Sequence, residues 1–299
     1  MFMDNSTVNA PEYYTYPRKL ENYKWFKPLL TGLLFLVFFG IFLIALFGVA
    51  LGLVLLEGGN PIEVLSTFSG GYDTMDVYSA PGTLISLGNI AIMIPAMMLA
   101  LKITKERPFH TLTSSRKGWN KSFFTKALII AFVINGIPQI VIAAIEGGFS
   151  HLGIRYTVFG FIVFLLLVPF QCMAEEYIFR GFIGQTVASW FKNPILAMIV
   201  STIIFMVMHG YNGIGQIGVF IAGLSLFVLI WYTKGLEASC ALHIVNNFMA
   251  FLLSGIGAAP MSSNSKLDGL IIETVINIAF VAAVIFMDKK MKWFSTGDN

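Results

Sequence analysis

The chain has 299 residues, of which 57% are hydrophobic and only 12% are charged. Soluble domains carry roughly 25% charged residues, so this composition excludes an ordinary water-soluble fold. The net charge of +3 is small, and the basic residues cluster at the ends of apolar runs, which does not indicate nucleic-acid binding. Cys172 and Cys240 fall inside apolar segments, so a secreted disulfide framework is not indicated either.

Apolar runs of about 20 residues recur along the chain, and each is long enough to cross a hydrocarbon core about 30 Å thick. Lipid cannot satisfy backbone polar groups, and the runs lack the alternation of barrel strands, so helices are expected. The predicted fold is all-α, a polytopic integral membrane bundle of about eight transmembrane helices. The predicted segments are 28–56, 82–102, 124–145, 156–174 continuing to about 191, 195–209, 215–232, 239–254 and 269–287.

The third segment contains polar and helix-breaking residues, Asn135, Gly136, Pro138 and Gln139, which predict a structural kink. The first segment has no small-residue cleavage site after it and is interpreted as a retained anchor.

Charge predicts the orientation of the bundle. The basic residues that flank the first two segments are Arg18, Lys19, Lys24, Lys27, Lys102, Lys105, Arg107, Arg116, Lys117 and Lys121. The loop between these segments instead carries Glu57, Glu63, Asp73 and Asp76. The positive-inside rule therefore predicts a multi-pass protein of the cell membrane with both termini cytoplasmic. We expect an N-terminal tail at 1–27, one membrane domain at 28–287 and a C-terminal tail at 288–299.

Ionisable residues inside membrane helices are costly, so each is a candidate functional residue. The sequence places Glu175, Glu176, Arg180, His209 and His243 in or at the ends of the predicted segments. Glu176 and Arg180 are an i, i+4 pair in the favourable order, so Glu176 is predicted to be held ionised by Arg180. Glu175 points about 100° away around the helix, where partial burial suits it to act as a general base.

Spacing predicts that these groups can meet. Glu175 lies 17 residues before Lys192 and His209 lies 17 residues after it. In an antiparallel hairpin both would then sit roughly 25 Å from the turn. His243 lies near the start of its segment, so a common level requires this hairpin to protrude into the cytoplasm, with the site opening inward.

His243 and Asn247 are four residues apart, share a helix face and could both donate hydrogen bonds to one oxygen atom. Together with the carboxylates they could activate water and stabilise a tetrahedral oxyanion, which predicts peptide-bond hydrolysis without a cofactor. In a rival interpretation, Glu175, His209 and His243 are ligands of a catalytic zinc ion, although His-Glu-x-x-His is absent. In a structural interpretation, the same groups form an ion pair, a helix cap and interhelical contacts.

At these residues the chain resembles the CPBP family of intramembrane proteases, which includes type II CAAX prenyl endopeptidases and bacterial bacteriocin-processing and self-immunity relatives. The matching motifs are Glu-Glu-x-x-x-Arg at Glu175, Glu176 and Arg180, followed by Gly181; Phe-x-x-x-His at Phe205 and His209; and His-x-x-x-Asn at His243 and Asn247. The resemblance covers a protease-like core at about 155–255. It implies a cytoplasm-facing, glutamate-dependent site. Glu175 and His209 would activate water there, and His243 and Asn247 would form the oxyanion hole.

The favoured hypothesis is an intramembrane endopeptidase whose partners are the lipid bilayer and a membrane-associated peptide or protein substrate. The alternative is a non-catalytic scaffold or bacteriocin-immunity protein that regulates a membrane or cell-envelope partner, since residues 1–150 match nothing specific. A transporter is less well supported, because no inverted repeat is present.

Overall fold

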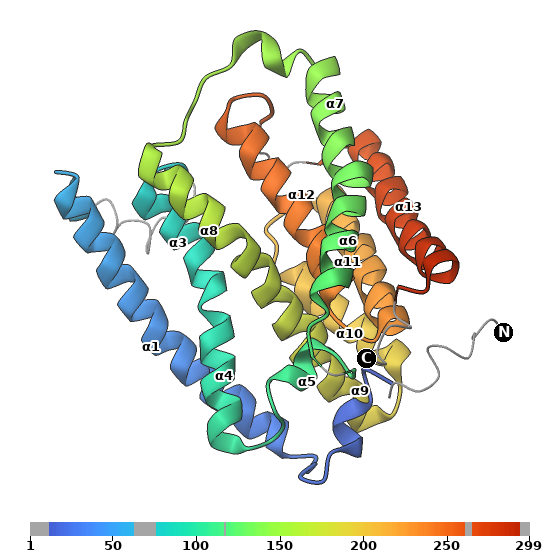
Figure 1. The fold of residues 1–299 in the computed structure, drawn as a ribbon. Coiled ribbons are helices and arrows are strands. Elements are labelled where there is room, and N and C mark those ends of the chain that lie inside the picture. Colours follow the sequence, from blue (N-terminus) through green and yellow to red (C-terminus); the bar gives the residue numbers. More distant parts are fainter. Residues whose placement is uncertain (1–11, 63–75, 117, 261–264, 294–299) are drawn as a thin grey trace.

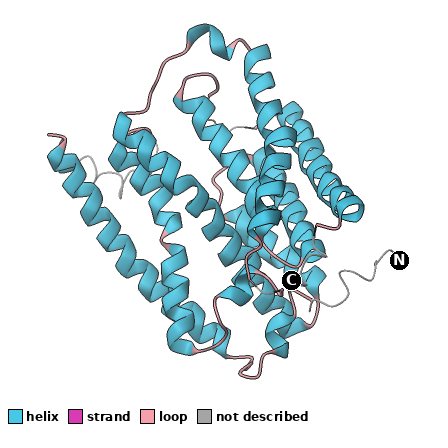
Figure 2. Ribbon diagram, in the orientation of Figure 1, coloured by secondary structure: helices cyan, strands magenta, loops and turns pink. Residues whose placement is uncertain are grey.

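The computed structural model describes residues 12–62, 76–116, 118–260 and 265–293. The predicted loop residues Glu63, Asp73 and Lys117 lie outside these ranges. The described residues form a bundle of helices (Figure 1, Figure 2). Their only β pairing is an isolated bridge between Ser114 and Gly235. The predicted class, an all-α polytopic membrane protein, is confirmed.

The helices have the following bounds in chain order. The first part contains η1 (Tyr16–Lys19), α1 (Lys27–Leu56), α3 (Ala80–Ala91), α4 (Met93–Thr104), α5 (His110–Thr113), α6 (Lys121–Ala131), the π-helix η3 (Phe132–Gly136), α7 (Ile137–Ile145) and η4 (Gly148–His151). The second part contains α8 (Val158–Glu175), the π-helix η5 (Glu176–Gly184), α9 (Gln185–Phe191), α10 (Pro194–Val207), α11 (Gly213–Thr233), α12 (Glu237–Gly255) and α13 (Leu267–Met291).

Among the described residues, seven helices are long and apolar enough to cross a membrane. The predicted fifth segment, 195–209, corresponds to α10, which has only 14 residues. At 1.5 Å per residue such a helix spans about 21 Å, less than the hydrocarbon core. The apolar run was identified correctly, but a turn follows Val207, so α10 is too short to be a full crossing.

Four lysines each end a helix of the bundle. Lys105, Lys192, Lys234 and Lys292 are the described non-glycine residues with positive φ, and they follow α4, α9, α11 and α13. A cationic side chain at a helix C-terminus also complements the negative end of the helix dipole. The ends of α4 and α9 and the start of α1 lie in the lower part of the view in Figure 1, and α13 ends further up at the right. We call the lower part the basic end; that it faces the cytoplasm stays a prediction.

The N-terminal segment from Glu12 is packed into the basic end rather than extending as a free tail. Tyr13 and Tyr14 are 0% and 1% exposed, and burial raises the pKa of both phenols well above the usual value. The Tyr13 hydroxyl donates to the Leu112 carbonyl, and the Tyr14 ring stacks on Phe227 at 3.7 Å. The predicted tail at 1–27 therefore contributes a packing element, which its polar composition did not reveal.

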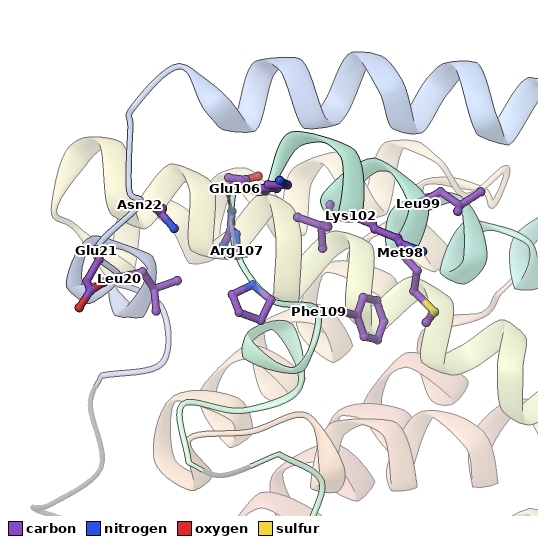
Figure 3. Close-up of a pocket in the computed structure, with 12 residues that line it drawn as sticks. Leu20, Glu21, Asn22, Met98, Leu99, Lys102, Glu106, Arg107 and Phe109 are labelled. Carbon is purple, nitrogen blue, oxygen red and sulfur yellow. Dashed lines mark hydrogen bonds and ion pairs between the residues drawn. The ribbon is translucent and has the colours of Figure 1, made fainter.

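A cavity of about 760 Å³ lies beside this N-terminal segment (Figure 3). Met98 and Phe109 line one side, and the turn at Leu20 lines the other. The Phe109 ring stacks on Tyr177 of η5 at 4.9 Å. The cavity thus adjoins the helix that carries Glu176, but none of the predicted site residues lines it.

Candidate active site

The predicted site residues come from three parts of the bundle that pack together. Glu175 is the last residue of α8, and Glu176 is the first residue of η5. His243 lies in α12, which packs against α8. The start of α12 is fixed by the buried Glu237 carboxylate, which accepts hydrogen bonds from Arg116 at 2.8 Å and from the Asn120 backbone at 2.8 Å. These contacts set the depth at which His243 faces the carboxylates.

The imidazole of His243 lies between the two neighbouring carboxylates. Its Nδ1 is 2.9 Å from Glu176 Oε1, and its Nε2 is 3.1 Å from Glu175 Oε2. The exposed fractions are 8% for His243, 7% for Glu175 and 0% for Glu176. The sequence predicted this convergence. It did not predict that both ring nitrogens of His243 would face carboxylates.

Glu176 and Arg180 form the predicted i, i+4 ion pair, with 3.1 Å between Glu176 Oε1 and Arg180 Nη1. Both residues are fully buried, and the guanidinium lies 4.0 Å from the centroid of the Phe205 ring. Gly223 of α11 packs closely here, because a Cβ there would lie 2.7 Å from Thr202 Cγ2 and 3.2 Å from Arg180 Nη2. The pair therefore lies between α10 and α11 as well as on η5.

His209 joins the cluster through Phe205. Its Nδ1 is 2.8 Å from the Phe205 carbonyl oxygen, to which it donates, and in the neutral imidazole of this tautomer Nε2 is an acceptor. The Phe205 ring centroid is 4.5 Å from that of His209 and 6.2 Å from that of His243. Phe205 thus contacts both imidazoles, and the half-buried His209 is linked to the carboxylates through this ring.

Asn247 lies one turn after His243 and is held on both sides. Its Nδ2 donates to Gln171 Oε1 at 3.2 Å, and its Oδ1 accepts from Asn246 Nδ2 at 3.3 Å. Gln171 and Asn246 were missed as site residues. Gln171 carried a usable signal, because it lies four residues before Glu175 in α8 and is therefore on the same helix face.

The zinc interpretation stays an alternative prediction. Among the described residues, no group of three or more His, Cys, Asp and Glu side chains could hold a metal ion. His209 uses Nδ1 on a carbonyl, and His243 has both nitrogens against carboxylates.

The class that the fold defines is a multi-pass helical membrane protein, and its bundle holds His243, Glu175 and Glu176 in one buried cluster. Residues 154–249 match the family model of type II CAAX prenyl endopeptidase Rce1-like proteins, and this range contains every predicted site residue. The predicted resemblance is thereby confirmed, and the match supports a general role as a protease.

The chain is also similar to the uncharacterized protein YyaK of Bacillus subtilis (strain 168). The two are 26% identical over 218 residues, which cover 67% of this chain and 73% of that protein. No solved structure matches the chain.

Proposed function

We propose that this chain is an intramembrane endopeptidase that hydrolyses a peptide bond of a membrane-associated peptide or protein. The observation that carries the proposal is the His243 imidazole held between the buried carboxylates of Glu175 and Glu176. Ionisable groups at membrane depth are costly, and their joint burial favours a reactive site over incidental packing. The family match over this part of the chain adds independent support.

The geometry supports different tasks for the two carboxylates. Glu176 is paired with Arg180 and contacts His243 Nδ1, so it holds the imidazole in one orientation. Glu175 lacks such an arginine partner in the described structure and lies on the Nε2 side of the ring. Glu175 is therefore the general base of the proposed reaction, and Glu176 is a positioning residue.

In the proposed reaction, a water molecule attacks the carbonyl carbon of the scissile peptide bond. Glu175 takes a proton from this water, assisted by His209 Nε2, and the proton passes to the leaving amine when the carbon–nitrogen bond breaks. The oxyanion accepts hydrogen bonds from His243 Nε2 and Asn247 Nδ2. In the structure, His243 Nε2 faces Glu175. In the proposed reaction, Nε2 turns from the Glu175 carboxylate to the substrate oxygen as negative charge develops on that oxygen.

The proposed setting is the cell membrane, with residues 28–287 as one membrane domain and the basic end in the cytoplasm. The lysines that end α4, α9, α11 and α13 support this orientation. The substrate would then approach from the bilayer or its cytoplasmic surface.

Replacing Glu175 with glutamine should lower cleavage about 10²- to 10⁴-fold, the range expected for loss of a general base. Glutamine has the size of glutamate but cannot take up the proton. The assay uses purified protein in liposomes and a library of acyl-anchored, fluorescence-quenched peptides, with yield and melting temperature as checks on folding. Wild-type protein is also assayed with a chelator, to test the expectation that no metal is needed.

Glu146→Gln is the matched control, because Glu146 is exposed at the end of α7 and should tolerate the same chemical change. Equal cleavage by the Glu175→Gln and wild-type proteins would overturn the proposal. The scaffold or immunity alternative is favoured by a different result: wild-type protein cleaves no peptide, and Glu175→Gln and Glu146→Gln both restore the phenotype of host cells that lack the protein. Loss of wild-type cleavage when the chelator is added would favour the zinc interpretation.

A further inference from the structure

Five amide side chains form a continuous hydrogen-bonded chain that begins at the irregular part of the third spanning helix and ends beside Glu175. The bonds run from Gln139 Nε2 to Asn135 Oδ1 (2.5 Å), from Asn135 Nδ2 to Asn246 Oδ1 (3.2 Å), from Asn246 Nδ2 to Asn247 Oδ1 (3.3 Å) and from Asn247 Nδ2 to Gln171 Oε1 (3.2 Å). We call these residues the amide chain. It joins three spanning helices through side chains alone.

The bonds of the amide chain all have the same direction. Each inner amide accepts on its oxygen and donates from its nitrogen, so successive dipoles are aligned and polarise one another. Asn135 is 4% exposed and Gln171 is 4% exposed. Inside a membrane, a buried amide that loses its partner cannot be satisfied by water. A break at one bond therefore favours rearrangement of its neighbours.

The π-helix η3 accounts for the start of the chain. Asn135 lies in η3, which packs against α12, and Asn135 reaches Asn246 there. Pro138 lacks a backbone N–H, and a π-helix before it accommodates the missing helical bond. The kink predicted from the sequence thus coincides with a contact to the helix that carries His243 and Asn247.

The amide chain fixes the orientation of the Asn247 side chain. Its oxygen is held by Asn246, and one of its two amide hydrogens is donated to Gln171. The second hydrogen of Nδ2 can donate to a substrate oxygen. Electrostatic catalysis requires donors that are already oriented before the charge develops, since reorientation would add to the barrier.

We infer that Gln171 and Asn135 are positioning residues that act on the reaction through Asn247. The inference rests on the proposed function, in which Asn247 is an oxyanion donor. It extends the functional site beyond the matched motifs to the third spanning helix, outside the range 154–249 that matches the family model. Gln171 acts directly on Asn247, and Asn135 acts through Asn246.

The kinetic test compares Gln171→Met and Asn135→Leu, which keep approximate size and remove the amide. Each should lower kcat about tenfold or more, less than removal of an oxyanion donor itself, with KM nearly unchanged. In an Asn247→Ala background the same substitutions should cause no further loss, because the residue they position is gone. Cleavage of the best acyl-anchored peptide in liposomes is the readout.

Asn277→Leu is the matched control. Asn277 lies in α13, is 5% exposed and donates to the Glu273 carbonyl at 2.9 Å, outside the amide chain. Its replacement should leave kcat within about twofold of wild type, since a lone amide bonded within its own helix changes stability and not transition-state binding. A kcat loss for Asn277→Leu equal to that for Asn135→Leu would overturn the inference.

The failures of the two proposals are distinguishable. If Asn247→Ala cleaves as well as wild type, the oxyanion assignment in the proposed function fails. If Asn247→Ala is impaired, but Gln171→Met lowers kcat by the same factor in the wild-type and Asn247→Ala backgrounds, the positioning inference fails. The oxyanion assignment then stands.

A second measurement needs no substrate. Gln171 and Asn135 do not bond directly, so independent contacts would give melting-temperature losses that add in the double variant. A chain that acts as one unit predicts a double-variant loss clearly smaller than the sum. Additive losses would overturn the inference whether or not the protein cleaves any peptide.

Discussion

Replacing Arg180 with methionine is expected to lower the free energy of unfolding by about 3–5 kcal/mol, the range for breaking a buried ion pair by removing one partner. The Glu176 carboxylate is 0% exposed and would lose the guanidinium 3.1 Å away, while it keeps its contact to His243 Nδ1. The same change removes the cation from the face of Phe205. Unfolding in mixed SDS and detergent micelles measures the loss.

A double variant separates the ion pair from the packing of the arginine side chain. Glu176→Gln combined with Arg180→Met leaves no unpaired buried charge, so it should be markedly more stable than Arg180→Met alone. Arg155→Met is the control, because Arg155 is exposed and its guanidinium lies over the face of Tyr78, 5.7 Å from the ring centroid; its backbone bond to Gly255 is kept in the variant. A loss for Arg180→Met no larger than that for Arg155→Met would contradict the account of this pair.

Replacing His243 with glutamine should lower kcat about 10²- to 10³-fold, the cost of losing an oxyanion donor, while KM changes little. Glutamine can still bond to one of the flanking carboxylates, so the folded state should survive. What is lost is the single rigid ring that contacts Glu176 and Glu175 at the same time. Kinetics on the same acyl-anchored peptide measure the effect.

His110→Gln serves as the control for this substitution. His110 is exposed at the start of α5 and should be insensitive to the change. If KM rises and kcat is unaffected in His243→Gln, the imidazole binds substrate and does not stabilise the transition state. That result would contradict the role assigned to His243.

Most of the membrane fold could be predicted from apolar run lengths, because the hydrocarbon core imposes a minimum length on each spanning helix. Run length is a poor guide where an apolar run is shorter than a full crossing, as in α10, which ends in a turn after 14 residues. The burial of Tyr13 and Tyr14 in the basic end could not be predicted either, since the polar sequence around them gives no sign of it.

The parts of the site that lie on one helix could be predicted from helical spacing. Periodicity is enough to pair Glu176 with Arg180 and to put His243 and Asn247 on one face. Partners across helices depend on packing and register, so the two-sided contact of His243 and the bond from Asn247 to Gln171 could not be predicted. Asn135 was singled out, but only as part of a kink, because its partner Asn246 lies 111 residues away.

The central claim is that this membrane protein hydrolyses a peptide bond, and mass spectrometry of the products in H₂¹⁸O tests it most directly. The purified protein in liposomes is incubated with the acyl-anchored peptides, with Glu175→Gln as the blank. The account predicts two fragments, with one ¹⁸O atom in the new carboxylate of the N-terminal fragment, formed by wild-type protein and not by the variant. Intact peptides after prolonged incubation with folded wild-type protein, or equal ¹⁸O-labelled fragments with the variant, would contradict it.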